Sequence, residues 1–190
     1  MKSFTGTDAA LGDVTLFAMH FATWERANRE QEFDRLLAAN GPALARIAAS
    51  YTNTSSDRDD LLQEIALAVW QALPGFRGEC SPRTFLFRIA HNRAIAHLAR
   101  SRGRFPAADV DDVHDPAPNP ESGLAREQTA EHLRRAIHRL PLVYRQVIVL
   151  TLEDIGYAEI AEVLGISESN VGARLSRARQ LLRESLEKRK

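Results

Sequence analysis

The sequence predicts an all-α protein made of two small helical domains that a flexible, acidic, proline-rich linker joins. Three observations carry this prediction. Apolar residues recur at helical spacing along most of the chain, no segment alternates apolar and polar residues as a half-buried strand does, and a stretch rich in Pro and Asp separates the helical parts. We expect the domains at 32–105 and 127–190, with an N-terminal extension over 1–31 and the linker over 106–126.

The N-terminal extension has no sustained period, although Phe17, Phe21 and Trp24 fall at helical spacing. It is interpreted either as a short docking helix or as a frayed tail. From Glu32 onward the pattern becomes helical. We expect this helix to break or kink near Gly41-Pro42, because Pro has no N–H to continue the hydrogen-bond ladder.

The first domain continues with two more predicted helices. Residues 55–57 offer an N-cap, and an apolar stripe at helical spacing follows over 61–73. Pro74-Gly75 ends this helix, and residues 77–82 form a turn-rich loop. The next helix is predicted from Thr84 to about Arg100.

The linker combines proline with acidic residues, and such a segment cannot bury enough apolar surface to fold alone. Its marker residues are Pro106, Pro116, Pro118, Pro120, Asp109, Asp111, Asp112 and Asp115. Charge is sorted around it. Residues 35–105 carry ten basic and five acidic side chains, 106–127 carry one and six, and 128–190 carry eleven and eight. The net charge of zero therefore hides two basic blocks, which predict a polyanionic partner contacted at two places.

The second domain is expected to start near Leu124 and to hold four helices. One precedes Pro141, which suits the first turn of the next helix. Residues 157–164 form a short third helix, Gly165 ends it, and the last helix spans 168 to about 188.

Residues 157–171 have the pattern of a helix-turn-helix. Ala161 is small where two helices cross, Gly165 supplies the turn, and Ser167 can cap the second helix. The outer face of that helix is polar, small or basic, as a helix entering the major groove needs. It carries Ser169, Asn170, Ala173, Ser176, Arg177 and Gln180, with Arg174, Arg179 and Arg183 at its flanks. Asn and Arg can read base edges, and flanking arginines can neutralise phosphates. The alternative is an ordinary helical hairpin with a solvated basic face.

Residues 83–104 hold no acidic residue and six arginines: Arg83, Arg88, Arg93, Arg100, Arg102 and Arg104. Arg88, His91 and Asn92 share one helix face, and phenylalanines are interleaved. Basic groups beside aromatic rings suit single-stranded or melted nucleic acid. For Phe85 and Phe87 we favour a position in the core.

An acidic cluster precedes this basic segment and consists of Asp57, Asp59, Asp60 and Glu64. Carboxylates can bind hard cations. They are also favoured in the first turn of a helix, where the dipole is positive. We therefore expect a protein-contact surface here, and neither a metal nor another cofactor.

Enzyme activity is not expected. His91 and His97, with Glu79 as base, could serve a metal-dependent hydrolase, but no nucleophile elbow, phosphate loop or His-Glu-x-x-His motif accompanies them. Cys80 is the only cysteine, which fits a reducing compartment. No signal peptide and no stretch near the roughly 18 apolar residues of a membrane helix are found, so a cytoplasmic protein without membrane insertion is expected.

Together these segments resemble the sigma-70 superfamily of RNA polymerase subunits, specifically its short extracytoplasmic-function (ECF) members. Residues 59–64 and 70–78 are similar to the region-two helix that grips the polymerase clamp, and Thr84–Asn92 to the promoter-melting segment that follows. The helix-turn-helix resembles region four. The resemblance covers about 32–104 and 127–187, in the family's order.

The resemblance implies a transcription initiation factor whose partners are core RNA polymerase, promoter DNA and an anti-sigma factor. Core polymerase would be bound through Asp60, Leu61, Gln63, Glu64 and Trp70, with Leu61 exposed. The minus-ten element would be bound by Phe76, Arg83, Thr84, Arg88, His91 and Asn92, with a flipped base near Phe76 and Asn92. The minus-thirty-five element would be read by Ser169, Asn170, Arg174, Ser176, Arg177 and Arg179.

Three residues depart from the family pattern. Phe85 stands where Trp is usual, and Gly172 and Ala173 stand where many members have a basic residue and a Ser or Thr. Recognition of the minus-thirty-five element should therefore depend more on Asn170, Ser176 and Arg177. The alternative function is a stand-alone helix-turn-helix transcriptional regulator, against which the acidic and aromatic segment before the arginine block argues.

Overall fold

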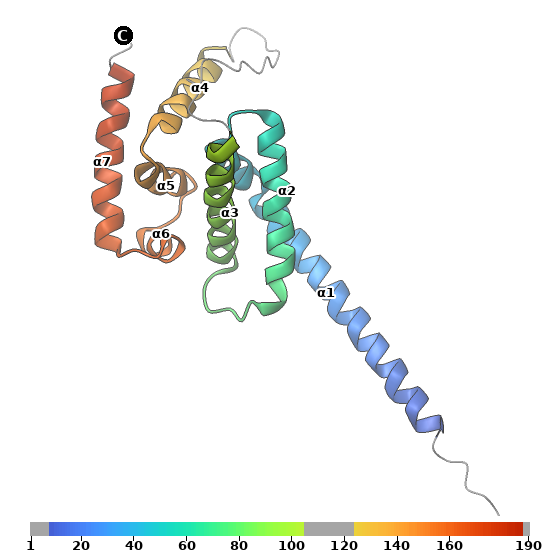
Figure 1. The fold of residues 1–190 in the computed structure, drawn as a ribbon. Helices are drawn as coiled ribbons and strands as arrows, with labels where there is room; N and C mark the ends of the chain where they lie inside the picture. Colours follow the sequence, from blue (N-terminus) through green and yellow to red (C-terminus); the bar gives the residue numbers. More distant parts are fainter. Residues whose placement is uncertain (1–7, 105–123, 188–190) are drawn as a thin grey trace, which may run out of the picture.

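The computed structural model describes the backbone of residues 8–104 and 124–187, and the side chains of 28–101 and 130–187. Over these ranges the chain forms helices and no strand, which confirms the all-α prediction. The helices are α1 (Asp8–Ala49), α2 (Ser55–Ala72), the 3₁₀ turn η1 (Leu73–Gly75), α3 (Pro82–Arg104), α4 (Leu124–Arg139), α5 (Leu142–Thr151), α6 (Tyr157–Leu164) and α7 (Glu168–Glu187). We call α1–α3 with η1 the N-terminal group and α4–α7 the C-terminal group (Figure 1).

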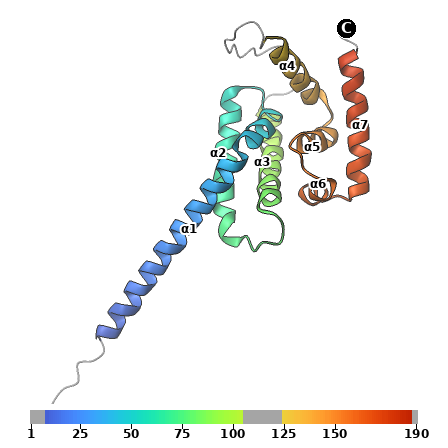
Figure 2. The same cartoon turned by 180° about the vertical axis from the view of Figure 1, so that it is seen from behind.

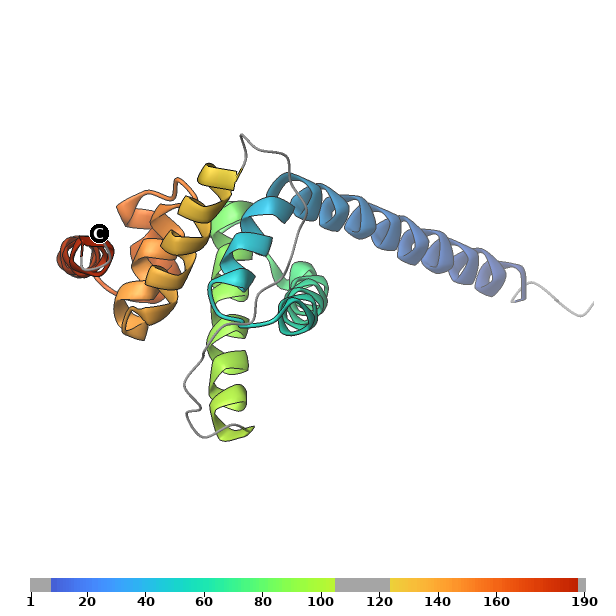
Figure 3. The same cartoon turned by 90° about the horizontal axis from the view of Figure 1, so that it is seen from above.

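Helix α1 takes in most of the expected N-terminal extension. Its N-terminal part projects away from the rest of the molecule, as Figures 1 and 2 both show. The side chains of Phe17, Phe21 and Trp24 lie outside the described residues. A break or a kink was expected near Gly41-Pro42. The helix continues through Pro42 without a break, and its last turns change direction relative to the long N-terminal part (Figure 3). A proline inside a helix removes one ladder hydrogen bond and allows such a bend.

The N-cap of helix α2 lies one residue before the expected cap segment, and the helix begins at Ser55. The Thr54 hydroxyl oxygen accepts the Asp57 N–H at 3.0 Å, so Thr54 is the N-cap. The helix ends at Ala72, and η1 holds Pro74 and Gly75, as predicted. Leu61, Ile65 and Val69 are fully buried along one side of α2, which fastens this helix to α1 and α3.

Helix α3 supplies much of the core of the N-terminal group. Phe87 and Leu86 are fully buried, and Phe85 is 8% exposed. The prediction that Phe85 and Phe87 belong to the core is confirmed. Burying a side chain of this size stabilises the fold by roughly 1.5–3 kcal/mol, so these rings are structural.

The C-terminal group follows the predicted helix boundaries closely. Gly165 has φ +65°, the left-handed region that glycine occupies without steric cost, and the Ile166 N–H donates to the Ala161 carbonyl at 3.0 Å. Behind the turn, Ile160, Val171 and Leu175 are fully buried. The helix-turn-helix is therefore a packed unit that holds α7 at the edge of the molecule.

The expected linker mostly lies in residues 105–123, outside the described residues. Its last expected residues are helical, because α4 already begins at Leu124. Seen from above in Figure 3, the C-terminal group packs against α3 and the end of α1, and α7 lies on the far side from α2. The buried side chains of the two groups form one continuous cluster.

Candidate nucleic-acid interfaces

Helix α7 presents the first candidate surface. Its buried side consists of Val171, Leu175 and Ala178, all without exposure, so the opposite side must face outward. All six predicted residues lie on this one helix, five of them exposed and Arg174 half-buried: Ser169, Asn170, Arg174, Ser176, Arg177 and Arg179. Figures 1 and 3 show no other helix beside this outer side.

Three side-chain hydrogen bonds shape the α7 surface. The Asn170 N–H donates to the Ser167 hydroxyl at 3.2 Å, which is the N-cap expected from the sequence. Arg177 Nη1 donates to Gln180 Oε1 at 2.8 Å, and Gln180 in turn donates to Glu184 at 2.9 Å. Arg177 is therefore held at the surface in a row of polar side chains that can rearrange toward a base edge.

Tyr157 adds to this surface and was not predicted. Its side chain is 44% exposed at the first residue of α6. A Cβ atom at Gly172 would lie 3.7 Å from the Tyr157 ring, so the ring covers the place where a side chain at 172 would begin. Residue spacing alone does not bring these two positions together, because the turn between α6 and α7 decides their distance.

The second candidate surface lies on α3 and is formed by Arg83, Thr84, Arg88, His91 and Asn92, which we call the α3 face. These residues come from the first three turns of the helix, and Phe76 stacks on Phe85 beside them with ring centroids 4.6 Å apart. Phe85 in turn is buried, so it supports Phe76 from below. The sequence predicted one helix face for Arg88, His91 and Asn92, and all three lie within two turns of α3.

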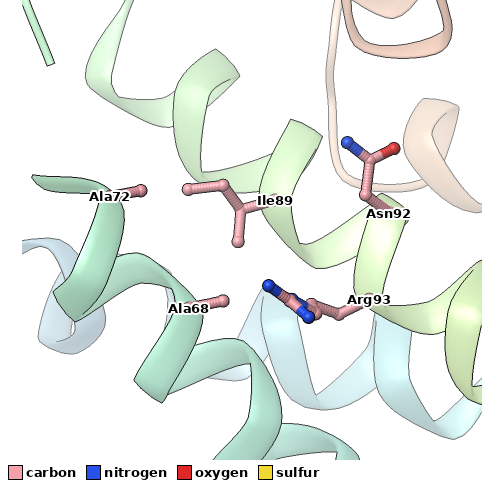
Figure 4. A pocket seen from close by; sticks show the side chains of 5 residues that line it. All are labelled: Ala68, Ala72, Ile89, Asn92 and Arg93. Carbon is pink, nitrogen blue, oxygen red and sulfur yellow. The ribbon is translucent and has the colours of Figure 1, made fainter. Parts of the chain in front are cut away.

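A pocket of about 260 Å³ opens between α2 and α3 next to this face (Figure 4). It is lined by Ala68, Ala72, Ile89, Asn92 and Arg93. The two alanines and Ile89 give it an apolar wall, while Asn92 and Arg93 bring an amide and a guanidinium group. Such a mixture suits a flat ring with polar edges. Arg93 was not among the predicted site residues, and Phe76 does not line the pocket.

Most of the α3 face is already in contact with the C-terminal group. Thr84 is 2% exposed and donates to Glu159 Oε1 at 3.0 Å, and His91 is 7% exposed with its Nε2 3.4 Å from the Gln146 amide nitrogen. Burial lowers the pKa of His91 to about 4, so its ring is neutral at pH 7. In this arrangement the C-terminal group covers Thr84 and His91, so DNA can reach them only after that group moves away, and their contact with DNA stays a prediction.

The two arginines of the α3 face are also engaged. Arg83 Nη2 donates to the Glu153 carbonyl at 2.6 Å, and its guanidinium lies 5.3 Å from the Phe87 ring centre. Arg88 Nη1 lies 3.7 Å from Glu162 Oε1. Of the five residues, Asn92 alone has no hydrogen bond or ion pair to the C-terminal group among the interactions described here, and it is exposed.

The third candidate surface is the outer side of α2. Asp60 and Gln63 are exposed, as the predicted contact with a protein partner requires. Leu61 is fully buried, so the expectation that it is exposed was wrong: it packs in the core and cannot touch a partner. Leu67, which is 58% exposed, is the outward apolar residue of this helix. The i, i+3, i+4, i+7 rule applied to Asp60 would have found it.

The remaining predicted residues of α2 have partners within the N-terminal group. Glu64 is paired with Arg100 at 2.5 Å and lies 3.7 Å from His97 Nδ1. Trp70 is half-buried and meets the edge of Phe33, with ring centroids 5.3 Å apart, while the Arg29 guanidinium lies 5.7 Å from the Trp70 ring centre. Trp70 therefore fastens α1 to α2 as well as reaching the surface.

The titratable side chains of the described residues do not gather into a metal site. Residues 28–101 and 130–187 contain no group of three His, Cys, Asp or Glu side chains that could hold a metal ion. His91 and His97 have different partners, Gln146 and Glu64, and so do not act together. Burial and the neighbouring Glu162 raise the pKa of the Cys80 thiol, which disfavours the reactive thiolate. Among the described helices, none is long and apolar enough to span a bilayer.

Two segments match described sequence families. Residues 36–104 match Sigma-70 region 2, and residues 130–182 match Sigma-70, region 4. The matches coincide with the N-terminal and C-terminal groups and leave out the projecting part of α1 and the linker.

Similar proteins cover both groups. The ECF RNA polymerase sigma factor SigM of Mycobacterium tuberculosis (strain H37Rv) is 32% identical over 171 residues, which are 90% of this chain and 82% of SigM. The ECF RNA polymerase sigma-E factor of Escherichia coli K12 is 29% identical over 164 residues, 80% of this chain and 85% of the relative.

Two solved complexes resemble the fold. The structure of CnrH with the cytosolic domain of CnrY matches with a TM-score of 0.63 and 31% identity, over 83% of this chain and 89% of the other. The sigma factor RpoE of Bartonella quintana with the anti-sigma factor NepR matches with a TM-score of 0.65, over 83% of this chain and 98% of the other. At 22% identity the second likeness speaks for the fold alone.

Proposed function

The chain belongs to the sigma-70 family, in its ECF group, and from this premise we propose how its surfaces share the work of promoter-directed transcription initiation. The observation that carries the proposal is that region 2 and region 4 matches occur in order on one chain, each on a helical group with a distinct outward surface. A stand-alone regulator would need the helix-turn-helix but not the region 2 group. The function is therefore that of a sigma factor.

We propose that the first domain, expected over 32–105, binds core RNA polymerase through the outer side of α2. Asp60, Gln63 and Leu67 supply a charge, an amide and an apolar side chain on one exposed face. A partner helix with basic and apolar residues would fit such a face. Glu64 and Trp70 contribute less directly, because both also hold the group together.

The same group is proposed to hold the melted minus-ten strand. Asn92 and Arg93 line a pocket with an apolar wall, which suits an unstacked base, and Phe76 offers an aromatic ring that stacks on Phe85. Arg83 and Arg88 can neutralise phosphates once they are released from the C-terminal group.

The second domain, expected over 127–190, is proposed to read the minus-thirty-five element with α7. Asn170 and Arg177 can reach base edges, while Arg174 and Arg179 flank them toward the phosphates. Tyr157, exposed at the first residue of α6, is proposed to contact a phosphate, a role that Tyr side chains often take.

Regulation by an anti-sigma factor is part of the proposal. Two similar structures are described as complexes, CnrH with the cytosolic domain of CnrY and RpoE with the anti-sigma factor NepR. By analogy this chain would act in the cytoplasm, would be held by such a partner, and would carry out no bond chemistry of its own.

The proposal is tested by titrating purified core RNA polymerase with the fluorescently labelled chain, in competition with an unlabelled primary sigma factor. A sigma factor binds saturably and is displaced by the competitor. A chain that binds duplex DNA specifically by itself, but shows no saturable binding to core polymerase, would instead be a stand-alone regulator.

A further inference from the structure

The C-terminal group covers the α3 face with acidic side chains. Glu159 accepts the Thr84 hydroxyl at 3.0 Å, and Glu162 lies 3.7 Å from the Arg88 guanidinium. Glu153 adds its carbonyl oxygen, which accepts from Arg83 at 2.6 Å. Each proposed minus-ten contact of these residues is thus occupied by an oxygen of the same chain.

These oxygens match what DNA would offer. Arginine and threonine side chains contact phosphate oxygens through ion pairs and charge-assisted hydrogen bonds, the kinds of contact that they make here with two carboxylates and a carbonyl. Glu159 and Glu162 lie on α6, the first helix of the helix-turn-helix, so one side of the DNA-reading unit serves as a stand-in for the DNA backbone.

A second set of contacts fixes the two groups together. Glu153 accepts from Arg46 Nε at 2.8 Å and from Arg46 Nη2 at 2.6 Å, a bidentate pair between α1 and the loop after α5. The Glu153 side chain is 3% exposed, so it depends on this partner, because a buried carboxylate without one is strongly disfavoured.

The end of α1 is held by the C-terminal group as well. A His138 ring nitrogen donates to the Ala49 carbonyl at 2.7 Å, and Arg145 Nη1 donates to the Ser50 carbonyl at 3.4 Å. Helix carbonyls at this end have no partner within the helix and carry partial negative charge, so donors from the other group stabilise the contact.

We propose that this chain closes its own minus-ten surface: Glu153, Glu159 and Glu162 occupy the α3 face in place of DNA phosphates, and the Arg46–Glu153 pair latches the closed state until a partner opens it. The inference rests on the proposed function of the α3 face. It assigns Arg46 a role in opening, although Arg46 itself is not among the residues proposed to bind DNA or polymerase.

The test uses the free full-length chain and a fluorescein-labelled random-sequence single strand of about 20 nucleotides, long enough to cover such a site. Arg46→Gln removes the latch and a positive charge, so charge alone would weaken binding. Its matched control is Arg35→Gln, on an exposed residue of the same helix. Because affinity scales with the open fraction, we expect Arg46→Gln to bind about tenfold more tightly than Arg35→Gln, with a larger radius of gyration in small-angle scattering.

A second pair of variants guards against misfolding at position 46. Glu162→Lys places a cation opposite Arg88, and Glu187→Lys makes the same charge change at the exposed end of α7. We expect Glu162→Lys alone to expand the chain and to exceed its control in affinity. Equal affinities within both pairs would overturn the proposal, and so would expansion without a gain in DNA binding. The titration of core polymerase is an independent experiment. A chain that fails to bind core polymerase refutes the proposed function, while the comparison of single-strand affinities still tests whether the C-terminal group covers the α3 face.

Discussion

The Glu64 carboxylate lies 2.6 and 2.5 Å, through its two oxygens, from one guanidinium nitrogen of Arg100. This pair joins the acidic side of α2 to the basic end of α3, and so a residue predicted to face the polymerase has a partner within its own domain. Asp60, one turn earlier on the same side of the helix, is exposed. The two acids should therefore respond differently to substitution.

Asp60→Lys should weaken binding to core polymerase by roughly tenfold or more, about 1.4 kcal/mol, because it reverses a charge on the proposed contact face. Its melting temperature should stay that of the wild type. Glu64→Gln, in contrast, removes the charge that pairs with Arg100. It should therefore lower the free energy of unfolding by about 0–1 kcal/mol, as is usual for an exposed pair. Titration with core polymerase and thermal unfolding of both variants check this. Unchanged core affinity of Asp60→Lys would remove α2 as the contact.

Leu61 and Leu67 provide a second contrast on α2. Leu61→Ala should cost about 2–5 kcal/mol of folding free energy, since it empties a fully buried position. Leu67→Ala should leave stability nearly unchanged, because the side chain is 58% exposed, and should weaken binding to core polymerase. Denaturant unfolding and the core titration measure the two effects. If Leu67→Ala bound core like the wild type, the apolar part of the proposed surface would lie elsewhere.

Gly172 is a cost to the stability of α7 that substitution should relieve. A Cβ there meets only the Tyr157 ring, at an ordinary 3.7 Å. Gly172→Ala should therefore stabilise the chain by about 1 kcal/mol, and the neighbouring Ala173→Gly should destabilise it by a similar amount. Both are read from urea unfolding. A loss of stability in Gly172→Ala would show that the Tyr157 contact is tighter than described.

Acid should weaken the fold through His91. Burial lowers its pKa from 6.5 to about 4, and the groups that face it are Tyr51 and Gln146. Between these two values the unfolded chain binds a proton that the folded chain does not. Stability is therefore complete above pH 6.5 and falls as the pH is lowered toward 4, by roughly 1 kcal/mol at pH 5.5. The free energy of unfolding is measured for the wild type and for His91→Gln at pH 7.5 and 5.5. An equal loss of stability between these two pH values in both proteins would contradict the prediction.

Two substitutions should separate upstream recognition from strand capture. Arg177→Ala removes a base contact, for which roughly 1–3 kcal/mol of discrimination is typical, so its defect should depend on the minus-thirty-five sequence. Asn92→Ala should impair open-complex formation, and a pre-melted bubble should not rescue it if Asn92 holds the flipped base. Initiation is compared on duplex and bubble templates with wild-type and altered upstream elements. Equal loss for Arg177→Ala on every upstream sequence, or normal initiation by Asn92→Ala on both templates, would withdraw the corresponding role.

The helices could be predicted because local rules determine them. The apolar spacing, Pro74-Gly75 and Gly165 each act within a few residues, and the outer face of α7 follows from which residues are apolar. Leu61 was wrongly predicted to be exposed because a family motif indicates that a residue is important, and does not indicate whether its side chain packs into the core. The apolar stripe over 61–73 already put Leu61 on the same side as Ile65, which is buried.

The covering of the α3 face could not be predicted from the sequence. Thr84 and Glu159 are 75 residues apart, and Arg46 and Glu153 are 107 apart. Such contacts depend on how two helical groups pack, and neither helical periodicity nor the charge of each segment determines that. In the described residues, α6 and the loop before it cover the basic α3 face.

The central claim, that this chain directs RNA polymerase to promoters, is tested most directly by transcription of genomic DNA with purified core polymerase, with and without the chain, and by mapping the 5′ ends of the transcripts. The account predicts a small set of start sites that appear only with the chain and that share two sequence elements at a fixed spacing upstream. Start sites that are the same with and without the chain would contradict it.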